Sequence, residues 1–214
     1  TQKTGEVNMT NVYERDLGTM QVTKVFENLT DANVDRLKDS FKLTVTGDRT
    51  DCVKGLDLKL TDDNVVKDPT AKHPTYTWTL TDVPTGSYTV KEARKDIKLP
   101  EFNLTVKNGV AGGGIITASE DGEFIQKDLT LAKDSRLEVF FQNAYIRQLG
   151  SLKLTKTVEG GPASAQTQTY TFKITGPEDA NGIYSGEEFT KGVATVTISG
   201  AGEKLIENLP TGSY

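Results

Sequence analysis

Several kinds of residue are scarce in this chain of 214 amino acids, and each scarcity excludes a class of protein. The one cysteine, Cys52, has no second cysteine with which to form an internal disulfide. With a single histidine, His73, the chain has too few ligands for a Cys/His metal site. Cys52 with His73 is the one possible thiol–imidazole pair, and both residues lie in polar, turn-rich segments. We therefore expect no enzyme, no metal and no cofactor.

Basic charge and long apolar runs are also lacking. Lys and Arg total 25 against 30 Asp and Glu, a net charge of −5 without a basic stripe, which argues against a nucleic-acid partner. No apolar run approaches the about 20 residues that a membrane-spanning helix needs. No signal peptide begins the chain and its first residue is Thr1, so we expect an excised piece of a longer protein.

The strongest positive signal is an internal repeat. Residues 6–28 (EVNMTNVYERDLGTMQVTKVFEN) match residues 138–160 (EVFFQNAYIRQLGSLKLTKTVEG) without a gap. Residues 80–88 (LTDVPTGSY) match residues 206–214 (IENLPTGSY) in the same order. The repeat predicts a window cut from a tandem array of similar domains.

Three parts of that array are expected in this chain. Residues 1–16 are predicted to be the last strand of a preceding domain, 17–146 a complete domain, and 147–214 the first half of a following domain. Apolar and polar residues alternate within each copy, which predicts β-strands. The predicted strands are 19–27, 41–47, 56–60, 75–82, 87–93, 101–107, 123–131 and 136–145, with one short helix at 31–38. Short strands joined by polar turns predict an all-β fold: Greek-key, immunoglobulin-like β-sandwich domains in tandem.

Three polar side chains fall on strand faces that the alternation assigns to the core. These are Lys24, Glu92 and Asn143, each of which shares its face with apolar residues. The repeat places Asn11 and Lys156 at the same strand positions, so both are also predicted on a buried face. Burying an unpaired charge is costly or drives the group to its neutral form, so we expect the three to interact. A plain buried Lys–Glu ion pair, or strand ends that reach solvent, is the alternative.

The chain resembles the collagen-adhesin B-type (Cna-B) and related pilin-linkage domains of Gram-positive surface proteins. The resemblance covers the whole chain and is carried by GSLKLTKTVEG, LPTGSY and VFFQNAY. It implies a self-formed isopeptide bond from Lys24 to Asn143, promoted by Glu92, with Asn11 and Lys156 as the equivalents in the partial domains. It also implies an extracellular location on the bacterial cell surface or cell wall, in the stalk or shaft of an adhesin or pilus.

The chemistry of these residue types agrees with that implication. Burial favours the neutral, nucleophilic amine of Lys24 and the protonated form of Glu92. Protonated Glu92 can donate a hydrogen bond to the amide oxygen of Asn143 and then pass protons to the departing ammonia. Such a reaction occurs once per molecule and is not enzymatic turnover. Asn11 and Lys156 are expected to stay unbonded, the alternative being that Asn11 of one molecule adds to the Lys156 strand of another.

Other signals favour simpler readings or a second function. The implied partners are neighbouring domains of the array, and host extracellular matrix or other pilus subunits. The alternative function is a ligand-binding β-sandwich for a host matrix protein or carbohydrate, with Tyr76, Trp78 and Phe140 as the candidate contact residues. The acidic segment 60–68 is expected to be a solvated loop rather than a calcium site. LPTGS at 209–213 is expected to be a turn rather than a sortase signal, because VPTGS recurs before a strand.

Overall fold

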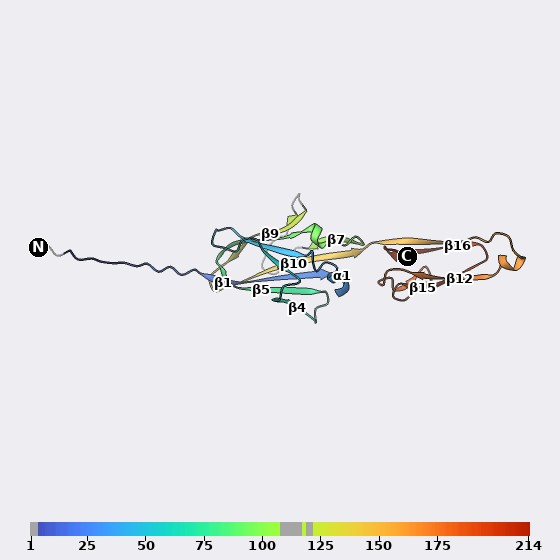
Figure 1. Ribbon diagram of the computed structural model, residues 1–214, viewed down its shortest axis with the longest axis horizontal. Helices are drawn as coiled ribbons and strands as arrows, with labels where there is room; N and C mark the ends of the chain where they lie inside the picture. The colour runs from blue at the N-terminus through green and yellow to red at the C-terminus, as the bar shows by residue number, and fades with distance from the viewer. Residues whose placement is uncertain (1–3, 108–116, 119–121) are drawn as a thin grey trace. The chain divides into compact units, whose positions relative to one another are not determined.

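The computed structural model describes residues 4–107, 117–118 and 122–214 (Figure 1). Almost all regular structure in these residues is β-strand, so the all-β prediction is confirmed. The predicted helix is shorter than expected: α1 spans Asp31–Asp35, with the Thr30 side chain capping its first turn. No helix in the described part of the chain is long and apolar enough to cross a membrane.

The chain forms two compact units. The first comprises Thr1–Lys98 and Thr105–Ala144, and the second comprises Leu99–Leu104 and Tyr145–Tyr214. The assignment of the chain to three successive domains of an array stays a prediction.

Two five-stranded sheets build most of the first unit, in the orders β4-β5-β1-β10-β7 and β3-β2-β6-β9-β8. The first contains β1 (Leu17–Glu27), β4 (Val65–Lys67), β5 (Thr75–Pro84), β7 (Phe102–Lys107) and β10 (Arg136–Arg147). The second contains β2 (Lys42–Gly47), β3 (Leu56–Lys59), β6 (Gly86–Ala93), β8 (Thr117–Ala118) and β9 (Glu123–Leu131), and the 3-10 helix η1 (Arg94–Ile97) follows β6. Every predicted strand of this unit is present, with ends shifted by at most a residue or two.

The strand β4 corrects one prediction. Residues 60–68 were expected to form a solvated loop, but β4 lies within them and pairs antiparallel with β5 at the edge of the sheet. Three residues are too few for a visible alternation of polar and apolar side chains, so the sequence carries no strand signal there.

The core of the first unit comes from the inward faces of both sheets. Burial along β1 alternates strictly, one residue buried and the next partly exposed, as a strand in a sandwich requires. The faces predicted to be buried on β1, β6 and β10 are buried. Their apolar members in this unit are Met20, Val22, Phe26, Tyr88, Val90, Leu137, Val139 and Phe141.

The second unit consists of antiparallel strand pairs. These are β11 (Leu149–Lys156) with β16 (Gly202–Pro210), β12 (Thr169–Thr175) with β15 (Val193–Ser199), and β13 (Gly182–Tyr184) with β14 (Glu187–Phe189), with the 3-10 helix η2 (Ala163–Gln166) before β12. Its core includes Ile174, Phe189, Val196, Ile206 and Leu209.

The repeat in the sequence is matched by a repeat in strand pairing. Leu17 of β1 lies opposite Pro84 of β5, and Leu149 of β11 lies opposite Pro210 of β16. In both ladders the register shifts just after the glycine that follows the leucine. One difference separates the copies: β1 also pairs in parallel with β10, whereas β11 has no second partner strand among the described residues.

Candidate functional site

A cluster of polar side chains lies in the core between the two sheets of the first unit. β1 and β10 are parallel neighbours in one sheet, with Lys24 opposite Phe141 and Phe26 opposite Asn143. Lys24 and Asn143 therefore point to the same side of that sheet. Glu92 lies on β6 of the other sheet, and all three polar residues have 0% exposed surface. The structure thus brings together the three residues that were predicted to interact.

Glu92 contacts both of its polar neighbours. Lys24 Nζ lies 2.6 Å from Glu92 Oε1 in an ion pair, and Asn143 Nδ2 donates a hydrogen bond of 2.8 Å to Glu92 Oε2. The buried Oδ1 of Asn143 has no hydrogen-bond partner among the described residues. The carboxyl group therefore holds an amine and a carboxamide at one place, while the carboxamide oxygen is left unsatisfied at a cost in free energy.

An aromatic shell keeps water from the lysine. Lys24 Nζ lies 5.1 Å from the ring centroid of Phe26 and 5.8 Å from that of Phe41. Phe41 packs edge-to-face on Phe26 at 5.4 Å and stacks on Trp78 at 6.0 Å. Burial lowers the pKa of Lys24 from 10.5 to about 8, although the charge of Glu92 opposes the fall. At pH 7 roughly one such amine in ten is then neutral.

The shell was only partly predictable. Phe26 was expected on the buried face, whereas Phe41, at the start of the predicted strand 41–47, was not assigned to the site. Trp78 was a candidate for an exposed ligand contact, and that prediction is wrong: it is fully buried, and its Nε1 donates to the carbonyl oxygen of Lys59 at 3.1 Å. The alternative function keeps two of its three candidates, since Tyr76 and Phe140 are partly exposed.

Asn11 and Lys156, the predicted equivalents of Asn143 and Lys24, were expected to be buried but are not. Asn11 is exposed, and residues 4–16 form no strand; Met9 and Tyr13 beside it are each 88% exposed. The alternation of this segment is that of a buried strand, but no described strand pairs with it to cover its apolar face. Lys156 is partly exposed, with Nζ 4.4 Å from the ring centroid of Tyr170, and it has no ion-pair partner among the described residues.

The two other candidate centres have ordinary structural partners. The buried Cys52 Sγ lies 3.7 Å from Arg15 Nη2 and 3.8 Å from the carbonyl oxygen of Thr85. His73 Nδ1 instead accepts a hydrogen bond of 3.3 Å from the backbone nitrogen of Asn28. The expectation that these residues carry no chemistry stays a prediction.

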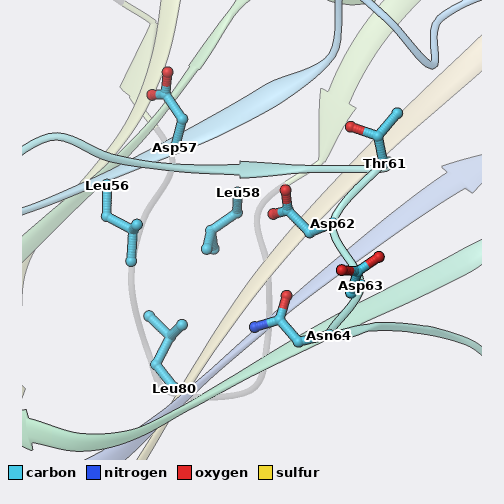
Figure 2. A pocket seen from close by; sticks show the side chains of 8 residues that line it. All are labelled: Leu56, Asp57, Leu58, Thr61, Asp62, Asp63, Asn64 and Leu80. Atoms are coloured by element: carbon cyan, nitrogen blue, oxygen red, sulfur yellow. The ribbon is translucent and has the colours of Figure 1, made fainter.

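The acidic segment borders a pocket of about 490 Å³. Figure 2 shows Leu56 and Leu80 on one side of it and Thr61, Asp62, Asp63 and Asn64 on the other. Asp57 accepts hydrogen bonds from Lys42 and Thr44, and Asp62 accepts one from the backbone nitrogen of Lys59. No group of three or more Asp, Glu, His or Cys in the described part of the chain is arranged to hold a metal ion.

The fold and this site define an all-β protein with a buried Lys–Glu–Asn cluster that links two facing sheets. No family model matches the chain, and no curated protein matches it. Among solved structures, the chain is similar to a candidate adhesin from Bacteroides ovatus, with 15% identity over 90% of this chain and 67% of that one. The TM-score is 0.28, which carries no argument about this chain. The resemblance to Cna-B-type domains therefore rests on the sequence motifs GSLKLTKTVEG, LPTGSY and VFFQNAY alone.

Proposed function

We propose that this chain is part of the stalk or shaft of a bacterial surface adhesin or pilus, stiffened by an isopeptide bond between Lys24 and Asn143. The observation that carries the proposal is the contact of amine, carboxyl and carboxamide within 2.6 and 2.8 Å in a fully buried core. A core that needs only stability is better served by apolar groups of the same volume, because desolvating a buried ion pair commonly cancels its attraction.

The proposed reaction exchanges one amide for another and needs no oxidant or cofactor. The neutral Nζ of Lys24 attacks Cγ of Asn143; the Nζ–Cγ bond forms, the Cγ–Nδ2 bond breaks, and ammonia leaves with one proton that came from the lysine. Protonated Glu92 polarises the carbonyl by donating a hydrogen bond to Oδ1. It then relays the proton lost by the lysine to the leaving ammonia. The lowered pKa of Lys24, about 8, supplies the neutral nucleophile.

The observed amide orientation differs from the predicted one in a way the reaction can use. Glu92 accepts a hydrogen bond from Nδ2 of Asn143 rather than donating one to Oδ1. Half a turn of the carboxamide exchanges these two atoms and gives the unsatisfied Oδ1 a donor. The reactive contact is the one in which the Glu92 carboxyl group donates to Oδ1.

The core itself favours the product. A lysine ammonium carries three N–H donors and a carboxamide two, whereas the isopeptide group carries one. Each buried donor or acceptor without a partner costs about 1–3 kcal/mol, so the product leaves fewer buried donors that need a partner. The leaving ammonia carries the surplus donors out to solvent.

The position of the bond suits a protein under tension. It joins the strand that enters the unit to the strand that leaves it, and these are parallel neighbours. A pull on the two ends is then carried through the crosslink, past all the residues between Lys24 and Asn143. Closing so long a loop contributes ~4–5 kcal/mol on the chain-entropy model used for disulfides. This reading includes an extracellular, cell-wall location and neighbouring array domains, with host matrix or pilus subunits as further partners.

Intact-mass spectrometry of the denatured chain tests the proposal. The wild type is expected to lack the mass of one ammonia relative to its sequence, and Lys24→Ala to have its full sequence mass. Lys153→Ala is the matched control, since this exposed lysine pairs with Glu203 at the surface, and it should still show the loss. A wild-type mass equal to that of the sequence would remove the crosslink.

A further inference from the structure

An arginine occupies the same place before the first strand of each unit. Arg15 precedes β1 and Arg147 precedes β11, each two residues before a Leu-Gly pair. Arg15 Nη2 donates to the carbonyl oxygen of Thr85 at 2.8 Å, and Arg147 Nη2 donates to the carbonyl oxygen of Thr211 at 2.7 Å. Both threonines belong to the Pro-Thr-Gly-Ser-Tyr turn of the same unit, so the sequence repeat includes a repeated contact.

Each arginine also forms an ion pair with a carboxylate in the loop that follows the second strand of its unit. Arg15 Nη1 lies 3.1 Å from Asp51 Oδ2. Arg147 binds Asp179 in a fork, with Nε 2.6 Å from Oδ2 and Nη2 3.2 Å from Oδ1. Fixed fork geometry and a permanent charge suit arginine, and not lysine, to holding a carbonyl and a carboxylate together.

The backbone adds a third contact at the residue after each arginine. The amide of Thr85 donates to the carbonyl of Asp16 at 3.0 Å, and the amide of Thr211 donates to the carbonyl of Gln148 at 2.9 Å. In both units the guanidinium and the main chain thus hold the same threonine from two sides.

The turn is built to present that threonine at a fixed place. Tyr88 Oη donates to the carbonyl of Pro84 at 2.5 Å, and Tyr214 Oη donates to the carbonyl of Pro210 at 2.9 Å. A Cβ added to Gly212 would lie 2.5 Å from the ring of Pro177, so this turn packs directly on the loop that carries the carboxylate. The turn that accepts the arginine is therefore held by a tyrosine hydrogen bond in each unit and, in the second unit, also by packing on this loop.

Arg147 makes additional contacts within the second unit. Its Nη1 donates to the carbonyl of Glu101 at 3.0 Å, and its guanidinium lies 5.1 Å from the ring centroid of Phe102. Its side chain is 18% exposed, against 31% for Arg15. Because less water competes for its contacts, Arg147 is the better position at which to measure their effect.

We propose that Arg15 and Arg147 are latches, each fixing the segment before a first strand onto the Pro-Thr-Gly turn of its own unit. The contacts are present in the structure whether or not the crosslink forms. Their role in resisting a pulling force rests on the proposed function as a stalk. In such an array the residues between Asn143 and Lys156 lie outside the crosslinked loops and transmit the whole load as single chain. Arg147 sits within that stretch, so its contacts must break before the segment around it straightens.

Hydrogen–deuterium exchange of the whole chain, read by mass spectrometry, tests the latch. In Arg147→Ala the peptides that contain Thr211 and Gln148–Gly150 are expected to exchange about tenfold faster or more than in the wild type, because losing charged hydrogen bonds opens this region more often. Arg147→Lys keeps the charge without the fork and should give an intermediate rate. Lys153→Ala, which removes an exposed ion pair on β11, should give the wild-type rate.

Several outcomes would overturn the latch. One is a wild-type rate at Thr211 in Arg147→Ala; another is an equal acceleration in Lys153→Ala. If Arg147→Ala also accelerates exchange in β12 and β15, the unit has unfolded. Asp179→Asn is then the deciding variant, and a wild-type exchange rate at Thr211 in it counts against the inference. The ammonia loss, measured on the same samples, tests the crosslink separately, so failure of either idea is seen without the other.

Discussion

The titration of Lys24 can be exposed by preventing the crosslink. In a crosslinked protein Nζ is part of an amide and does not titrate. Asn143→Ala removes the acceptor of the bond and leaves the lysine, Glu92 and the aromatic shell in place. The stability of this variant should then depend on pH through the buried amine, whose pKa is lowered from 10.5 to about 8 by burial.

The sign and size follow from proton linkage. Between pH 8 and 10.5 the unfolded chain keeps the proton on Lys24 while the folded chain has released it, so the free energy of unfolding rises with pH. The two pKa values differ by about 2.5, and each unit corresponds to 1.36 kcal/mol, so the gain is about 3 kcal/mol. Below pH 8 both states bind the proton and this contribution is flat.

Urea unfolding at pH 7, 8, 9 and 10.5 measures the effect, followed by the fluorescence of Trp78, the single tryptophan, which is buried in the shell. The double variant Lys24→Met/Asn143→Ala removes the titrating amine, and subtracting its free energies cancels the titration of all other groups. The difference between the two variants should move by about 3 kcal/mol in favour of the lysine as the pH rises. A difference that stays constant, or falls, would refute the argument that burial destabilises the charged amine.

Two further predictions concern the residues around the bond. Glu92→Gln and Glu92→Ala are expected to fold, by circular dichroism, but to keep their full sequence mass, because the proton donor is gone; crosslinking of the Ala variant at the native rate would mean that Glu92 has been misassigned. The purified wild type is expected to run as a single monomer band on a denaturing gel, since Asn11 is exposed and Lys156 has no ion-pair partner among the described residues. A covalent ladder that disappears in Asn11→Ala would instead show bonding between molecules.

The strand faces of the site were predictable because they depend on local alternation alone. Any strand with one buried side needs apolar residues at every second position, so a polar residue in that series is visible in the sequence. Lys24, Glu92 and Asn143 were found in this way, and all three are buried. Their meeting was not a local property. It was expected from the cost of burying unpaired polar groups, but the arrangement that achieves it, with β10 parallel to β1 and β6 in the other sheet, cannot be read from alternation.

The wrong predictions have the same origin. Alternation says which face a side chain takes and is silent on whether another strand covers that face. Asn11 lies in a segment with the pattern of β10 but is exposed, because no described strand pairs with that segment. Trp78 looked like a scattered surface aromatic, but it is fully buried and stacks on Phe41, which lies far from it in the sequence. The latches were also unpredictable, since their carboxylates lie in loops that share no motif.

Within the proposed stalk, the crosslink and the latch are suited to different physical surroundings. An amide can form between lysine and asparagine only where the amine is desolvated enough to lose its proton, and Lys24 meets that condition with no exposed surface. The segment before a first strand has no such core around it: Arg15 is 31% exposed, and a lysine there would stay charged and unreactive. A guanidinium suits that place because it keeps its charge at every physiological pH and binds a carbonyl and a carboxylate at once. In the proposed stalk, the buried core of the first unit thus suits covalent fixation, and the more exposed segment before a first strand suits charged hydrogen bonds.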